Sequence, residues 1–149
     1  MADAPRLAID AMGGDVGLAV MLSGAAIARG RWPGLTFDLV GDEAAIKSAL
    51  DSHPNLRAAS EVVHAPETIS GHEQVAQAIR RAKTTSMGIA IDSVKKGRAG
   101  AAVSAGNTGA LASAAEVLAI SDGAAAAGTP AAADAAPARK SVRIRKADL

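Results

Sequence analysis

Two short turns of small polar residues carry the candidate chemistry of this chain. They read DAMGGD over residues 10–15 and SAGNTGA over residues 104–110. Each turn follows a short apolar run typical of a buried strand and precedes a helical pattern. In an open parallel sheet, ligands bind beyond the carboxyl ends of the strands, where helix N-termini present free N–H groups and glycines let a ligand approach the backbone. The two turns together predict a site for an anion such as phosphate.

The side chains of the two turns also admit simpler roles. Ser104, Asn107 and Thr108 can add donors to an anion site, but Asn107 or Thr108 can equally be an ordinary helix N-cap. Asp10 and Asp15 would repel an anion unless they bind a cation, orient donors or face away. Either aspartate can also simply cap its turn. The spacing of the residues does not decide between capping and a role in the site.

Other familiar chemistries are not supported by the sequence. The chain has no cysteine, which excludes disulfides, thiolate nucleophiles and cysteine-ligated metals. It has no Walker A run and no nucleophile elbow, and Gly13, Gly14 and Gly17 lack the spacing of a dinucleotide fingerprint. The three histidines are scattered, without metal-ligand spacing. We therefore expect no metal and no cofactor, and we disfavour a nucleotide site.

The bulk composition indicates one soluble domain. The chain has 149 residues, 49% of them hydrophobic, which is enough for a core. Aromatic residues are only 1%, so we expect Trp32 and Phe37 to do the packing that several rings usually share. A net charge of +1 gives no general attraction to nucleic acid. No signal peptide or membrane-spanning run is visible, so a cytoplasmic location is expected.

Strands and helices alternate along the first 120 residues. Apolar and β-branched runs predict strands at 6–10, 35–40, 60–65 and 99–104. Helical patterns fall between and after them, up to about Arg29, from Asp42 as N-cap, at 72–83, 86–97 and 108–120. This alternation predicts an α/β fold with a parallel sheet covered on both faces.

Two details of the first helices are also predicted. In the first helix Val20, Ser23, Gly24 and Ile27 recur at helical spacing, so this face is expected to pack on the sheet. In the second helix Pro54 and Asn55 are expected to mark the end, since proline interrupts helices.

The sequence changes character after Ile120. Residues 121–149 are rich in alanine with scattered glycine and proline, which is typical of a flexible low-complexity segment. Its end is basic, with five Lys or Arg residues between 139 and 146. A second hypothesis follows from this tail: a non-enzymatic α/β module that docks on a carrier protein, a nucleic acid or a membrane. The simpler interpretation is a solubilising tail.

Taken in order, three stretches resemble the PlsX family of bacterial phosphate acyltransferases of phospholipid synthesis. They read LAIDAMGGD from residue 7, LVGDEAAIKSAL from residue 39 and RRAKTTSMGIAIDSVKKGRAGAAVSAGNTGAL from residue 80. The resemblance runs from about Arg6 to Ile120. It implies a Rossmann-like, three-layer α/β/α fold related to phosphotransacetylases. It also implies a reaction that converts fatty acyl-acyl carrier protein and inorganic phosphate to acyl phosphate and free carrier protein.

The resemblance assigns roles to the residues of both turns. It implies that the second turn supplies phosphate or oxyanion donors: Ser104 and Asn107 as catalytic residues, Gly106 and Thr108 as phosphate-binding residues. The first turn is implied to shape the loop and orient substrate: Asp10, Gly13, Gly14 and Asp15. In the full-length family, a homodimer and peripheral membrane association are also implied.

The chain departs from this family in length and in detail. Family members are usually more than twice as long, and the position of Leu18 often holds proline in them. We therefore expect residues 1–120 to be the N-terminal part of the acyltransferase domain, with an incomplete sheet. Residues 121–149 are expected to be an unrelated tail, and the change at Ser121 suggests a truncation or a frame change. Whether the chain is active alone stays open.

Overall fold

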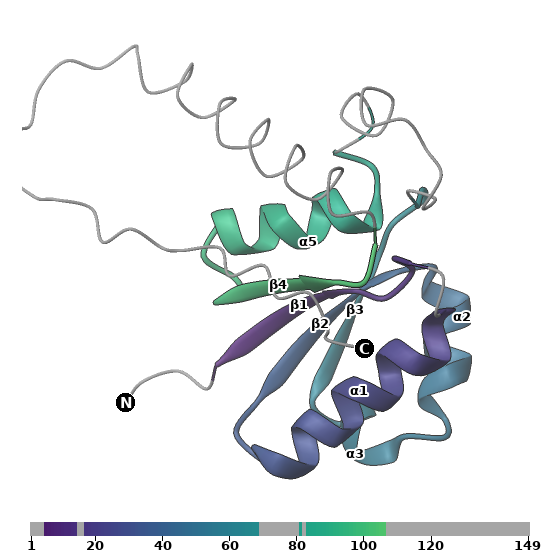
Figure 1. Ribbon diagram of the computed structural model, residues 1–149, viewed down its shortest axis with the longest axis vertical. Coiled ribbons are helices and arrows are strands. Elements are labelled where there is room, and N and C mark those ends of the chain that lie inside the picture. The colour runs from purple at the N-terminus through teal and green to yellow at the C-terminus, as the bar shows by residue number, and fades with distance from the viewer. Residues whose placement is uncertain (1–4, 15–16, 69–80, 82, 107–149) are drawn as a thin grey trace, which may run out of the picture.

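The computed structural model describes residues 5–14, 17–68, 81 and 83–106. In these residues four strands alternate with helices (Figure 1), which confirms the α/β class. The elements are β1 (Arg6–Asp10), α1 (Gly17–Arg31), β2 (Thr36–Gly41), α2 (Glu43–Leu50), α3 (Pro54–Arg57), β3 (Ser60–His64), α5 (Ser86–Lys95) and β4 (Ala101–Ser104). The helix expected at 108–120 and nearly all of the one at 72–83 lie outside the described residues, as does the boundary expected at residue 120.

The four strands form one parallel sheet in the order β3-β2-β1-β4. β1 is therefore central, and its last residue, Asp10, lies beside Val40 of β2 and Ser104 of β4. Because all the strands run the same way, their C-terminal ends meet along one side of the sheet, which we call the carboxyl edge. Both motif turns begin at this edge.

The described helices cover both faces of the sheet (Figure 1). α1, α2 and α3 pack on one face, where Leu22, Phe37 and Ile46 belong to a common buried cluster. α5 packs on the other face, where Ala90 and Val94 meet Ala8 of β1. The arrangement is the three-layer α/β/α sandwich expected of a partial Rossmann-like domain. Among the described helices, none combines the length and apolar character needed to cross a membrane.

α1 packs on the sheet through a different face from the one expected. Its buried residues are Leu22 and Ala25, whereas Val20 and Ile27 are 55% and 60% exposed. The prediction was wrong because small and apolar residues surround almost the whole helix, so spacing did not distinguish one face from another. The expectation for the aromatic residues held only in part: Phe37 is buried, but Trp32 is 58% exposed.

Pro54 begins a helix instead of ending one. α2 ends at Leu50, and Pro54 occupies the first turn of the short helix α3, which buries Leu56. Proline is tolerated in the first turn of a helix because the N–H it lacks would have no intrahelical partner there. The prediction that Pro54 closes the second helix is therefore corrected.

The start of α2 confirms Asp42 as an N-cap. Asp42 Oδ1 accepts a hydrogen bond from the Ala45 N–H at 2.8 Å. We expect Asp42→Ala to lower the free energy of unfolding by about 1 kcal/mol, because a first-turn N–H then loses its acceptor. Urea unfolding followed by circular dichroism measures this loss. Asp42→Asn keeps an acceptor oxygen and should stay close to the wild type; an equal loss in both variants would contradict the capping role.

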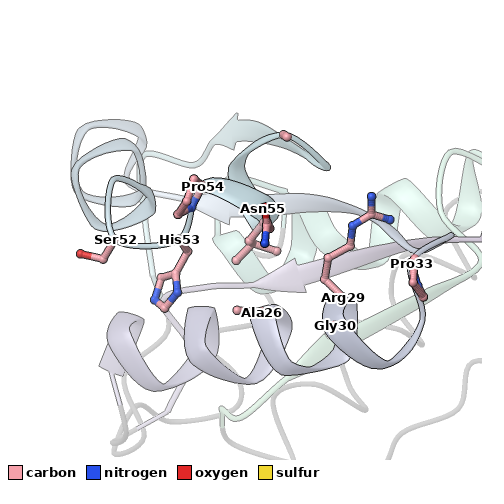
Figure 2. Close-up of a pocket in the computed structure, with 10 residues that line it drawn as sticks. Ala26, Arg29, Gly30, Pro33, Ser52, His53, Pro54 and Asn55 are labelled. Atoms are coloured by element: carbon pink, nitrogen blue, oxygen red, sulfur yellow. The ribbon is translucent and has the colours of Figure 1, made fainter.

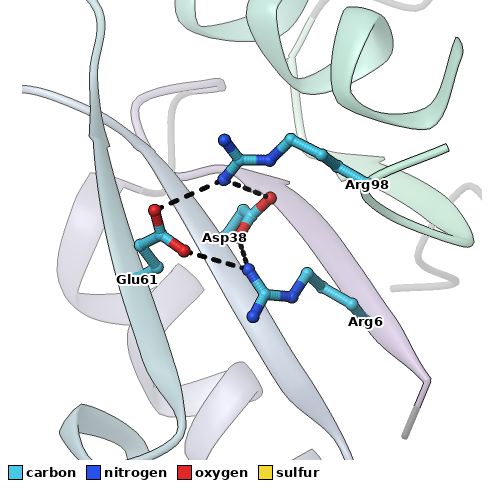
Figure 3. A network of polar contacts seen from close by, with 4 residues as sticks. All are labelled: Arg6, Asp38, Glu61 and Arg98. Atoms are coloured by element: carbon cyan, nitrogen blue, oxygen red, sulfur yellow. Dashed lines mark hydrogen bonds and ion pairs between the residues drawn. The ribbon is translucent and has the colours of Figure 1, made fainter. Parts of the chain in front are cut away.

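A four-residue ion network braces the face of the sheet that α5 covers (Figure 3). The Asp38 carboxylate on β2 is fully buried and lies 2.7 Å from Arg6 Nη1 and 3.3 Å from Arg98 Nη2. Glu61 on β3 lies 3.1 Å and 3.5 Å from the same two guanidinium atoms. The hydrogen bond to Glu61, with help from Asp38, raises the pKa of Arg6. The network joins three strands to the turn between α5 and β4.

Candidate functional site

The two motif turns are joined by side chains at the carboxyl edge. Asp10 ends β1, Ser104 ends β4, and the two residues are paired in register. Ser104 Oγ donates to Asp10 Oδ2 at 2.7 Å and accepts from the Gly106 N–H at 3.0 Å. The Met12 N–H donates to Asp10 Oδ1 at 3.3 Å. The Asp10 carboxylate is buried, and both of its oxygens accept hydrogen bonds. Through Ser104 it links the first turn to the second.

Glycines allow the two turns to touch. A Cβ atom on Gly13 would lie 2.3 Å from Asp10 Oδ2 and 2.7 Å from Ser104 Oγ. A Cβ atom on Gly14 would lie 2.3 Å from the carbonyl oxygen of Ala105, and Gly14 has a φ of +85°. These contacts leave no room for side chains, so the backbone itself forms the surface where the turns meet.

A third element reaches the same edge. α5 runs antiparallel to the strands, and in Figure 1 its N-terminal end lies beside the carboxyl end of β4. A Cβ atom on Gly106 would lie 2.8 Å from Met87 Cε in the first turn of α5. Thr85 caps this helix by accepting from the Gly88 N–H at 3.2 Å. The start of α5 was not predicted to belong to the site, although a threonine before an apolar run is a usable N-cap signal.

The structure brings five of the eight predicted site residues together. Asp10, Gly13, Gly14, Ser104 and Gly106 meet at the carboxyl edge.

The other three, Asp15, Asn107 and Thr108, lie outside the described residues. In the part of the chain that the structure describes, no three acidic, histidine or cysteine side chains cluster so as to hold a metal ion.

A separate groove of about 550 Å³ lies at the other end of the sheet, between the end of α1 and the segment around α3 (Figure 2). Arg29 and His53 line it, but they lie towards opposite ends of the groove. The Arg29 guanidinium is already engaged, since Nη1 donates to the Leu35 carbonyl at 2.9 Å. The groove therefore has no convergent polar pair, and it is remote from both motif turns.

Comparison with known proteins decides the family. The model of the fatty acid synthesis protein family matches residues 5–142, which is most of the chain and includes both turns. The chain belongs to this family.

Curated relatives of this chain are named phosphate acyltransferase. The one from Erythrobacter litoralis is 60% identical over 101 residues, which cover 68% of this chain and 28% of the relative. The one from Bradyrhizobium diazoefficiens is 54% identical over 101 residues, covering 67% and 29%. The one from Afipia carboxidovorans is 53% identical over 106 residues, covering 70% and 30%.

These matches confirm the resemblance to phosphate acyltransferases. The chain spans less than a third of the length of these relatives.

Proposed function

We propose that this chain is the N-terminal portion of a phosphate acyltransferase and that its carboxyl edge helps to bind inorganic phosphate. The proposed reaction forms acyl phosphate from fatty acyl-acyl carrier protein in phospholipid synthesis. The observation that carries the proposal is the Asp10–Ser104–Gly106 link, which holds two glycine turns in contact at one edge of a parallel sheet. Such an edge is where open α/β sheets bind ligands.

The proposed chemistry needs positioning more than reactive side chains. An oxygen of hydrogenphosphate attacks the thioester carbonyl carbon, the carbon–sulfur bond breaks, and the carrier protein leaves as a thiol that carries the proton lost by the hydrogenphosphate. The protein must hold phosphate against the thioester and stabilise the oxyanion of the tetrahedral intermediate. Backbone N–H groups suit this task, and so does an amide side chain. We assign the oxyanion contact to Asn107, which follows Gly106 directly, and a phosphate contact to Thr108.

Ser104 and Asp10 have positioning roles in this proposal. The single hydroxyl proton of Ser104 is given to Asp10, so in this arrangement it is not available to a ligand. The oxygen of the same hydroxyl accepts from the Gly106 N–H and so fixes the start of the second turn. Both Asp10 oxygens accept hydrogen bonds, from the Met12 N–H and the Ser104 hydroxyl, and these donors offset part of its repulsion of a nearby phosphate. Gly13, Gly14 and Asp15 shape the opposite turn.

The proposal is tested by titrating the 149-residue chain with inorganic phosphate in a calorimeter. We expect binding by the wild type and a Kd about 10-fold weaker in Ser104→Ala, because losing the bond that orients a turn costs about 1 kcal/mol or more. Ser48→Ala, on the exposed side of α2, is the matched control and should bind like the wild type. An absence of phosphate binding by the folded wild-type chain would refute the proposed site.

The other partners remain proposals that rest on the family. They are acyl-acyl carrier protein as the second substrate, a homodimer and peripheral membrane association. Formation of acyl phosphate by the purified chain, followed with a fatty acyl-acyl carrier protein and phosphate, would establish that this portion is active alone. The docking hypothesis for the basic tail concerns residues outside those described.

A further inference from the structure

A buried hydroxyl without a hydrogen-bond partner lies at the start of α5. Ser86 is 1% exposed, and its Oγ atom has no partner within the described structure. Leaving a buried polar group unpaired costs about 1–3 kcal/mol, so an alanine would be the more stable choice at this position. Unpaired buried groups of this kind call for an explanation, and a ligand is one.

Capping of the helix does not explain this hydroxyl. The Ser86 N–H donates to the Glu67 carbonyl at 2.9 Å. The Gly88 N–H donates to Thr85 Oγ1, and the Ile89 N–H donates to the Thr85 carbonyl. Thr85 is therefore the N-cap of α5, and the Ser86 side chain makes no capping hydrogen bond in the described structure. Among the buried side chains that the structure describes at this helix end, the Ser86 hydroxyl is the group without a partner.

The surroundings of the hydroxyl favour an anion. α5 has ten residues, and its N-terminal end carries the partial positive charge of the helix dipole. The next residue, Met87, reaches Gly106 in the second motif turn. Arg81 is ion-paired with Glu67 at 2.9 Å, and Glu67 lies beside Thr85. A buried hydroxyl donor and a helix N-terminus thus lie at the end of α5 that contacts the second motif turn through Met87 and Gly106.

We propose that Ser86 is a phosphate-positioning residue, whose Oγ–H donates to a non-attacking oxygen of the phosphate held at the carboxyl edge. The inference rests on the proposed function, since it adds a third element to the same site. It explains why a polar side chain is kept in a buried place where nothing else in the described structure satisfies it. It also assigns a role to the start of α5, which lies outside both motif turns.

The test compares two Ser→Ala variants on one helix. Ser86→Ala and Ser93→Ala both remove a buried hydroxyl from α5, but Ser93 lies two turns further along, away from the carboxyl edge. Inorganic phosphate is titrated into each 149-residue chain in a calorimeter, and Tm is measured in parallel. We expect Ser86→Ala to bind about 10-fold more weakly, with an unchanged or higher Tm, and Ser93→Ala to bind like the wild type.

The outcomes separate this inference from the proposed function. Unchanged binding in Ser86→Ala, together with weaker binding in Ser104→Ala, would overturn the role of Ser86 and leave the phosphate site standing. A lower Tm in Ser86→Ala with unchanged binding would show a structural role and would also overturn it. If the wild-type chain binds no phosphate, both proposals fail. Weaker binding confined to Ser86→Ala and Ser104→Ala supports both.

Discussion

Gly14→Ala is expected to lower the free energy of unfolding by about 3 kcal/mol or more and to abolish phosphate binding. Two costs add. A residue with a side chain at a φ of +85° is strained by about 1–2 kcal/mol. The new methyl group would also lie 2.3 Å from the Ala105 carbonyl oxygen, so the backbone of one turn must move away from the other. Urea unfolding and phosphate calorimetry measure the two effects.

Gly24→Ala is the matched control for this variant. Gly24 lies inside α1, its backbone is helical, and an added Cβ meets nothing within 4 Å. Alanine should therefore stabilise the chain by about 0.5–1 kcal/mol, through helix propensity and a less flexible unfolded state. If Gly14→Ala proves as harmless as Gly24→Ala, the two turns do not touch as described.

Asp38→Asn should lower the free energy of unfolding by about 2–3 kcal/mol. The variant keeps the shape of the side chain but removes the fully buried negative charge that lies between Arg6 and Arg98. Removing one partner of a buried ion pair costs about 3–5 kcal/mol, and the partial exposure of both arginines reduces that figure. Urea unfolding at neutral pH gives the difference directly.

Glu61→Gln is the control for the ion network. The Glu61 side chain is 58% exposed, although it contacts the same two arginines, so its loss should cost less than about 1 kcal/mol. Added salt should weaken the contribution of Glu61 more than that of Asp38, because exposed pairs are screened more strongly than buried ones. Equal losses in the two variants would contradict the assignment of Asp38 as the centre of the network.

The strands were predictable because buried parallel strands are short, continuous apolar runs. β1 was predicted at its observed bounds, and β2, β3 and β4 to within about two residues at each end. The packing of α1 was not predictable, because a helix with apolar residues on nearly every side does not define its own buried face. α3 was missed for a related reason: Pro54 is compatible with both the end and the beginning of a helix, and only tertiary contacts of Leu56 decide between them.

The site was predictable in outline but not in its contacts. The parallel topology predicts that both turns lie at the same edge, and the register of Asp10 with Ser104 agrees. The hydrogen bond between them joins residues 94 positions apart. It depends on β4 being the neighbour of β1, which no local pattern encodes. The sequence likewise could not predict that the Ser86 hydroxyl is unpaired, because this depends on which polar atoms the fold places around it.

The strand order has a consequence for how the protein forms during synthesis. β1, β2 and β3 lie within the first 64 residues, whereas β4 completes the other side of β1 only after residue 101. Closing this long loop is slow relative to pairing between strands that are near in sequence. We therefore expect β1, β2 and β3 to pair before β4 joins the sheet, so that the hydrogen bond between Asp10 and Ser104 forms after them. On the proposed function, phosphate affinity would arise only when β4 docks on β1, and phosphate binding would report this step in refolding experiments.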